Sequence, residues 1–158
     1  PRLEHEPRGL ARDQLDAEKV RMVVYTQIYY SLIDTLPLCA FVWGPGSLFS
    51  YRDLEDVIYY ATGWQVSFWE LMKVGERRIN MMRAFNAREG VDSSADVLPE
   101  RLFAPMQGKS DGKGKFVPRK ELREAIKTYY SMMNWDEESG NPTKAKLQEL
   151  GLGWLAAS

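Results

Sequence analysis

The chain has 158 residues and a formal net charge of -1, with 44% hydrophobic and 27% charged residues. This length fits one compact domain or two small helical lobes, and the composition is typical of a soluble globular protein. The near-neutral charge gives no reason to expect nucleic acid or an anionic membrane as a partner. The single cysteine excludes an internal disulfide and fits a reducing compartment, so we expect a cytoplasmic location.

The first 15 residues are polar and contain two prolines and a glycine, which predicts a linker or arm before a helical domain over residues 16–158. The chain starts at Pro1 without a charged-then-apolar leader, which suggests a processed protein or a piece of a longer one. The longest uncharged stretch, residues 35–51, is interrupted by prolines and glycines, so we expect no membrane span.

The first predicted helix begins at Asp16, a typical N-cap residue, and runs to about Ile33. Residues 22–33 carry no charge, so we expect most of this helix's surface to be covered. Pro37 should stop the helix, and residues 34–49 should form a long irregular connection. Its apolar positions recur at helical spacing: Val20, Val23, Val24, Ile28 and Leu32.

Two more helices have clear boundary signals. Ser50 is expected to cap a helix over about residues 51–62. Ser67 and Glu70 form a capping box, which predicts the start of the longest helix, over about residues 68–88. Gly75 lies inside this helix and indicates a close helix crossing. The expected inner stripe is Phe68, Leu71, Met72, Gly75, Ile79, Met82 and Phe85.

The last third of the chain alternates loop and helix. Residues 91–117 read mostly as loop, and residues 107–116 lack apolar content, which predicts a mobile surface loop. A helix is expected over residues 119–133, followed by a short one that is capped by Asn141 or Thr143 and ends near residue 151. No segment shows strand alternation, so the expected fold is all-α, with about five helices and long irregular loops.

The single cysteine, Cys39, stands five residues after Asp34. A free cysteine is most often a small buried hydrophobe; the alternatives are a thiolate ligand completed by other segments and a nucleophile, for which the lone His5 is a poor base. Asp34 is either a solvent-exposed helix end or an acceptor for a ligand rich in N–H donors, such as a pterin or guanine ring. The long helix's arginines are interpreted as its solvated face: Arg77, Arg78, Arg83 and Arg88.

Three stretches carry a family resemblance: "ATGWQVSFWELMKVGERRINMMRAFNAREG" at residues 61–90, "LPERLF" at 98–103 and "YYSMMNWDEESGNPTKAKLQELGL" at 129–152. In order and spacing they resemble the C-terminal domain of the tungsten-containing aldehyde ferredoxin oxidoreductase family. The resemblance covers roughly residues 16–152. It implies a helical fragment of an enzyme roughly fourfold larger, which oxidises aldehydes to carboxylic acids and passes electrons to ferredoxin.

The same resemblance implies roles for residues of the opening connection. The family motif Asp-x-x-Gly-Leu-Cys falls on residues 34–39, so Asp34 and Leu38 are expected to contact the pterin of a tungsten or molybdenum cofactor. Cys39 is expected to be the fourth ligand of a 4Fe–4S cluster whose other three cysteines lie in a part of the protein absent here. The isolated chain should therefore hold no cofactor and be inactive. The expected partners are the remaining domains, ferredoxin and a small aldehyde, and no catalytic residue is implied in this chain.

Two positions depart from the family pattern. Pro37 replaces the motif's glycine, and Met133-Asn134 stand where the family often has Arg-Gly. Residues 41–49 are expected to shape one wall of the substrate channel. Two alternatives remain: a fragment of a benzoyl-CoA reductase-type tungsten enzyme, and a helical interaction module in which Asp34 and Cys39 are ordinary structural residues.

Overall fold

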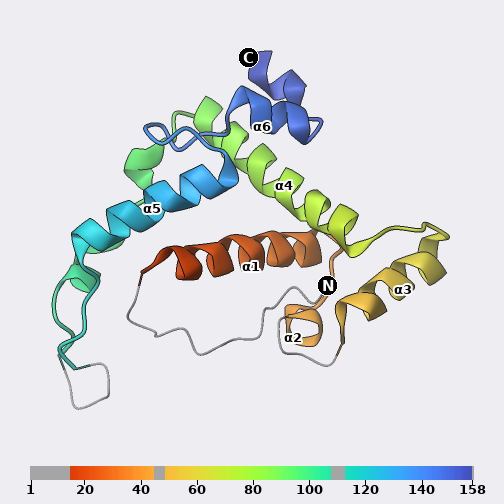
Figure 1. The fold of residues 1–158 in the computed structure, drawn as a ribbon, viewed down its shortest axis with the longest axis horizontal. Helices are drawn as coiled ribbons and strands as arrows, with labels where there is room; N and C mark the ends of the chain where they lie inside the picture. Colours follow the sequence, from red (N-terminus) through yellow and green to blue (C-terminus); the bar gives the residue numbers. More distant parts are fainter. Residues whose placement is uncertain (1–14, 45–48, 108–112, 158) are drawn as a thin grey trace.

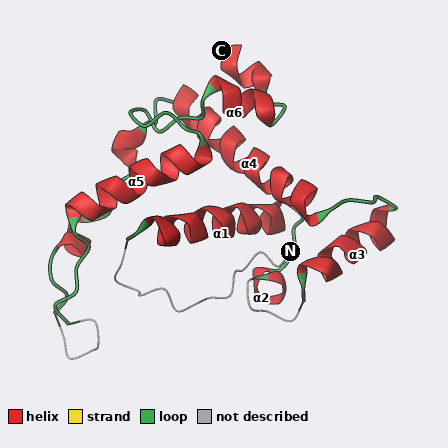
Figure 2. Cartoon of the chain, in the orientation of Figure 1, coloured by secondary structure: helices red, strands yellow, loops and turns green. Residues whose placement is uncertain are grey.

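The computed structural model describes residues 15–44, 49–107 and 113–157, and over these ranges the protein is all-α (Figures 1 and 2). The sole β-type feature in them is one isolated bridge, between Trp135 and Pro142. The predicted fold class is confirmed. The α-helices are α1 (Ala17–Thr35), α2 (Ala40–Trp43), α3 (Tyr51–Thr62), α4 (Phe68–Arg88), α5 (Arg119–Met133) and α6 (Lys144–Glu149), and the short 3₁₀ helices are η1 (Ser93–Ala95), η2 (Glu100–Phe103) and η3 (Gly153–Ala157).

Helix α1 starts as predicted, because the Asp16 side chain accepts a hydrogen bond from the Lys19 backbone N–H at 2.8 Å. It ends later than expected, at Thr35, so Asp34 lies in its last turn rather than in the connection. The connection is also less irregular than predicted, because α2 forms inside it. The remainder of that connection, residues 45–48, lies outside the described residues.

Helices α3 and α4 have the predicted boundaries and N-cap residues, and Ser50 and Ser67 each form a capping box. Figure 1 shows α4 crossing the end of α1, with α3 extending away from that crossing. The crossing is close because of Gly75: a Cβ there would lie 2.2 Å from the Ile28 carbonyl oxygen and 2.9 Å from the Leu32 nitrogen. The prediction of a close helix crossing at this glycine is confirmed.

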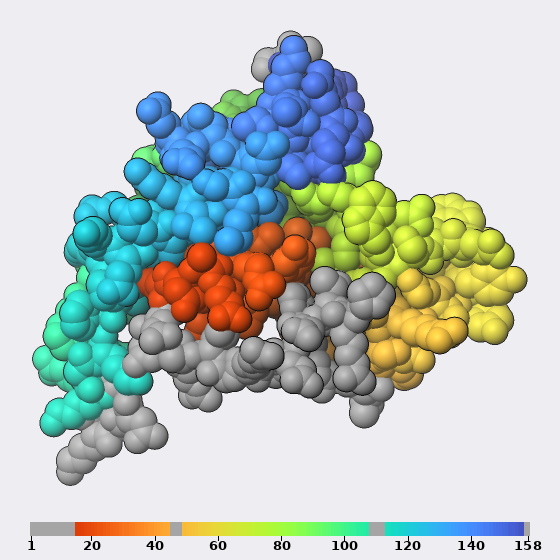
Figure 3. Space-filling model, in the orientation of Figure 1, coloured from red at the N-terminus to blue at the C-terminus, as the bar shows by residue number. Residues whose placement is uncertain are grey.

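Helix α5 packs along α1 (Figure 3), and α6 lies against α4, where Nζ of Lys146 donates to the Glu76 carboxylate at 2.8 Å. Two of the expected inner residues of α4 are on the surface, since Met82 is 51% and Phe85 59% exposed. Helices α5 and α6 cover instead the face of α4 that carries Asn80 and Ala84, which are buried. Most of the charge-free stretch of α1 is covered, as expected: of residues 22–33 only Val23, Gln27 and Tyr30 are exposed.

The chain segments around the predicted mobile loop are held together. The Met106 N–H donates to the Lys115 carbonyl and the Gly114 N–H to the Met106 carbonyl, both at 2.9 Å. The middle of the predicted loop, residues 108–112, lies outside the described residues. Thr143 proves to be the cap of α6, with its hydroxyl accepting from the Lys146 N–H at 3.1 Å. None of the helices in the described ranges is long and apolar enough to cross a membrane.

Candidate functional site

The candidate site is the turn that joins α1 to α2 and carries Asp34, Leu38 and Cys39. The Asp34 side chain is 59% exposed and its Oδ2 lies 3.3 Å from Nη1 of Arg78 on α4. One face of the carboxylate is thus paired with a guanidinium, and most of its surface is open. Both interpretations of Asp34, an exposed helix end and an acceptor for a ligand, are compatible with this position.

Cys39 is exposed, so the interpretation of this thiol as a small buried hydrophobe is wrong. The thiol is exposed because its apolar neighbours in the sequence are the side chains that face inward. Leu36, Leu38 and Val42 pack against the core of α1, α3 and α4, which leaves the thiol on the outer side of the turn. His5, the one histidine that could serve a nucleophilic cysteine as its base, lies outside the described residues.

The backbone between the two polar residues has an unusual shape at Pro37, whose φ is +23°. A proline ring favours a φ of about -65°, and positive φ is the region where glycine is at home. The turn is closed by the Leu38 N–H, which donates to the Ile33 carbonyl at 3.0 Å. Pro37 stands where the family motif has a glycine. Its backbone therefore has the geometry of a glycine, although the residue is a proline.

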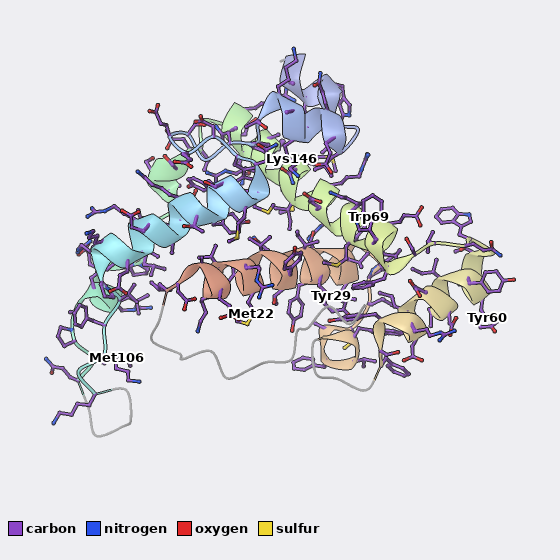
Figure 4. The ribbon with its side chains drawn as sticks, viewed as in Figure 1. Met22, Tyr29, Tyr60, Trp69, Met106 and Lys146 are labelled. Carbon is purple, nitrogen blue, oxygen red and sulfur yellow. The ribbon has the colours of Figure 1, made fainter. Side chains whose placement is uncertain are left out.

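A group of aromatic side chains packs beside this turn; one of them, Tyr29, points from α1 toward α2 (Figure 4). The Tyr29 hydroxyl donates to the Trp43 carbonyl at 2.5 Å, which ties α1 to the end of α2. Burial raises the pKa of Tyr29 to about 12, so this hydroxyl stays a donor over the working range of pH. Tyr51 stacks on Phe68 with ring centroids 4.3 Å apart and meets Tyr29 edge-on at 5.3 Å.

The outer side of α2 is apolar and open. Phe41 is 95% exposed and Phe49 46%, whereas Trp43 is buried at 8%. Trp43 and Phe49 stack at 4.8 Å between centroids, so the indole belongs to the support of the turn rather than to its outer surface. Among the described residues of 41–49, the large side chains that are open enough to line a substrate channel are therefore Phe41 and Phe49.

No group of three or more His, Cys, Asp or Glu side chains that could hold a metal ion occurs in the described ranges. The donor set at the turn is one accessible thiol and one accessible carboxylate. An iron–sulfur cluster takes four thiolates, so this turn could supply one ligand of such a cluster and one acceptor for an N–H-rich ring. The remaining ligands have to come from elsewhere in the protein.

The interpretation of the α4 arginines as a solvated face is wrong for Arg83, whereas Arg77 and Arg88 are exposed and Arg78 is half-buried. The Arg83 side chain is 10% exposed; it pairs with both oxygens of Asp96, at 3.1 and 2.7 Å, and donates through Nε to the Gly140 carbonyl at 2.8 Å. Arg77 donates to the Leu150 carbonyl. Arg78 pairs with Asp34, while Arg88 is exposed as expected. The one signal in the sequence was the acidic residue Asp96 in the loop after α4, which by itself does not identify Arg83 as its partner.

Two of the three stretches that carry the family resemblance, residues 61–90 and 129–152, meet around Arg83. The Tyr130 hydroxyl donates to Asp96, Trp135 donates through Nε1 to the buried Asn80 at 2.8 Å, and Arg83 lies over the Trp135 ring at 5.4 Å. Burial, together with the neighbouring Asp96 carboxylate, raises the pKa of Tyr130 well above its usual range. These contacts therefore fix the junction of α4, α5 and α6, away from Cys39.

The structure is thus an all-α domain that presents an accessible thiol and an accessible carboxylate on one supported turn. Residues 2–152 match the family described as aldehyde ferredoxin oxidoreductase, domains 2 & 3. The chain belongs to the aldehyde ferredoxin oxidoreductase family.

Individual relatives agree with this assignment. Over 137 residues the chain is 37% identical to a tungsten-containing aldehyde ferredoxin oxidoreductase of Pyrococcus abyssi and 34% identical to one of Pyrococcus furiosus, covering 85% of this chain and 21% of each relative. It is 27% identical to a Pyrococcus furiosus aliphatic sulfonate oxidoreductase, WOR-like subunit, covering 80% of this chain and 20% of that protein. The aligned part of the chain thus spans about a fifth of the length of these relatives.

One solved structure shares the fold. The active site complex BamBC of benzoyl coenzyme A reductase, in complex with 1,5-dienoyl-CoA, superposes with a TM-score of 0.72 at 23% identity. The match covers 96% of this chain and 22% of that one. At this identity the likeness establishes the arrangement of the helices and not a shared chemistry.

Proposed function

We propose that this chain is the C-terminal part of a tungstopterin iron–sulfur enzyme that oxidises aldehydes to carboxylic acids with ferredoxin as the electron acceptor. In that enzyme Cys39 supplies one thiolate to a 4Fe–4S cluster, and Asp34 and Leu38 contact the pterin. The observation that carries the proposal is the exposed thiol of Cys39, held beside an exposed carboxylate by a turn whose apolar residues are packed. An exposed thiol is open to reaction with other molecules, and binding to cluster iron would occupy it.

The chemistry requires both groups to be reachable from outside the domain. Oxidation of an aldehyde by water gives the carboxylic acid, two protons and two electrons, and the bound metal supplies the oxygen-transfer chemistry. In this chain Asp34 would accept hydrogen bonds from ring N–H groups of the pterin. Cys39 would bring the cluster next to it. Leu38 packs inward, so its contribution is to fix the turn and to offer its backbone and remaining surface.

The test uses the full-length protein that contains this chain, produced anaerobically with tungsten. We expect Cys39→Ala to lose cluster iron and its visible absorbance, while the control Lys127→Ala, at an exposed position of α5, keeps them. Asp34→Asn should retain the cluster but release pterin, measured as fluorescence after denaturation. A Cys39→Ala protein with full cluster content, or an Asp34→Asn protein with full pterin content, would contradict the corresponding role and favour the alternative of purely structural residues.

A further inference from the structure

The orientation of Asp34 is set from α4. Asp34 and Ser31 lie three residues apart on α1, so their side chains share one face of the helix. Gly75 and Arg78 have the same spacing on α4. These four residues meet where the two helices cross, and we call them the crossing clamp.

The contacts of the crossing clamp run from the backbone outward to the carboxylate. The Ser31 hydroxyl donates to the Gly75 carbonyl at 2.9 Å, and Ser31 is 5% exposed. Nη1 of Arg78 lies 3.4 Å from the Ser31 hydroxyl oxygen and 3.3 Å from Oδ2 of Asp34. The guanidinium thus bridges a buried hydroxyl and the exposed carboxylate on successive turns of α1.

This bridge has a rigid foundation. No side chain is available at position 75, and the helices approach so closely there that an added Cβ would meet the α1 backbone. The fork of an arginine is planar and loses less freedom per hydrogen bond than a lysine ammonium, which suits it to holding a carboxylate in one orientation. Arg78 itself is partly exposed, at 36% of its side chain, so its energetic contribution to the fold alone should be small.

We infer that Arg78 is a positioning residue for the cofactor, which holds Asp34 so that its free oxygen can accept from the pterin ring. The inference rests on the proposed function, because it gives Asp34 the role of pterin acceptor. Arg78 binds Oδ2, which leaves Oδ1 to face the ligand. Removing a side chain that orients a ligand-binding group typically weakens the affinity for the ligand about tenfold or more.

The experiment is a double-mutant cycle in the full-length protein: Arg78→Gln, Asp34→Asn and the two together, with Arg52→Gln on the exposed face of α3 as a matched loss of one arginine. The readouts are retained pterin, the W(V) electron paramagnetic resonance spectrum and the melting temperature. We expect Arg78→Gln to weaken pterin retention by about tenfold and to shift the W(V) signal. In the Asp34→Asn background the Arg78→Gln change should add nothing, and Arg52→Gln should match the wild type.

Each other outcome decides a separate point. If Asp34→Asn releases pterin but Arg78→Gln behaves like Arg52→Gln, the positioning role is wrong and the proposed function stands. If Asp34→Asn itself has no effect, the proposed pterin contact fails, and the positioning role fails with it. Additive losses would mean that Arg78 acts without Asp34, which also overturns the inference. Should Arg78→Gln not fold, Arg78→Lys replaces it; this variant keeps the charge but not the fork, and we expect a smaller loss in the same direction.

Discussion

Pro37 shows at the scale of one residue how the sequence and the fold disagree. Its φ of +23° is far from the value that a proline ring favours, and it lies between the two polar residues of the candidate site. The neighbours determine this geometry: the Leu36 N–H closes α1 on the Leu32 carbonyl, and the Leu38 N–H returns to the Ile33 carbonyl, each at 3.0 Å. The backbone conformation therefore follows from the hydrogen bonds on both sides and not from the residue that occupies the position.

We predict that Pro37→Gly raises the free energy of unfolding by about 1 kcal/mol, since relief of backbone strain of roughly 1–3 kcal/mol exceeds the extra unfolded-state entropy of glycine. Denaturant unfolding of the purified chain measures it. The control is Pro99→Gly, at an exposed proline with a φ of -54°, which has no strain to relieve and should lose about 0.4–1 kcal/mol. Equal losses in both variants would show that Pro37 is not strained.

At the scale of elements, α4 is the helix that organises the molecule. Its capping box and its crossing at Gly75 could be predicted from the sequence, because both depend on residues that are close along the chain. The burial of Arg83 and the exposure of Phe85 could not, because they depend on which helices return to cover α4. The candidate site shows the same division. The family resemblance indicated Asp34 and Cys39, but the contact between Asp34 and Arg78 could not be predicted, because it depends on how α1 and α4 cross.

The crossing itself can be tested with Gly75→Ala. The added methyl would meet the Ile28 carbonyl at 2.2 Å, and a backbone atom cannot move aside as a flexible side chain can. We expect a net loss of roughly 1–3 kcal/mol in unfolding free energy, after the gain in helix propensity of about 1 kcal/mol. Higher stability in the alanine variant would mean that the helices do not approach each other closely at this glycine.

A ring of alternating charges joins α4 to α6: Lys73, Glu76, Lys146 and Glu149, with Lys146 lying 2.8 Å from Glu76 and 2.7 Å from Glu149 (Figure 4). Hydrogen bonds from Lys146 and Lys73 lower the pKa of Glu149. Burial by itself would lower the pKa of Lys146, but its bonds to the two glutamates outweigh this and raise it. A lowered carboxyl pKa stabilises the fold above the unfolded-state value and loses that effect as the pH falls through the folded value.

We therefore predict that the stability of the fold decreases at acidic pH and that part of this decrease depends on Glu149. The melting temperature of the chain should fall as the pH drops below about 4.3, the usual value for a glutamate. Glu149→Gln should be less stable than the wild type at neutral pH, and the difference should shrink toward acid. Glu124→Gln, on the exposed side of α5, is the control and should keep the wild-type profile. A difference for Glu149→Gln that stays constant across the acid range would contradict the linkage.

At the scale of the whole molecule, much apolar surface is left uncovered among the described residues. Tyr60 near the end of α3 is 83% exposed and Trp69 at the start of α4 is 68% exposed (Figure 4). Trp64, between the two helices, is 67% exposed, and Phe41, close to Cys39 in the sequence, is 95% exposed. The aligned relatives continue for about four fifths of their length beyond the part that this chain matches. Large apolar patches on a protein surface usually mark interaction sites, and the remaining domains are the expected cover. Leu36, Leu38, Val42 and Trp43, by contrast, pack internally, so only part of the connection between α1 and α3 is open to other domains.

The isolated chain should consequently be folded and helical, yet unable to hold the cluster that its cysteine serves. The helices have their own caps and buried faces, whereas the thiol count is one against the four that a cluster takes. Anaerobic incubation with iron and sulfide, followed by gel filtration and visible absorbance, tests this. We expect the monomer to elute without a cluster, to show a helical circular dichroism spectrum, and to have one thiol that is readily alkylated, since Cys39 is exposed. A stoichiometric cluster in the monomer would show that Cys39 is not one ligand of a set that is completed by the rest of the enzyme.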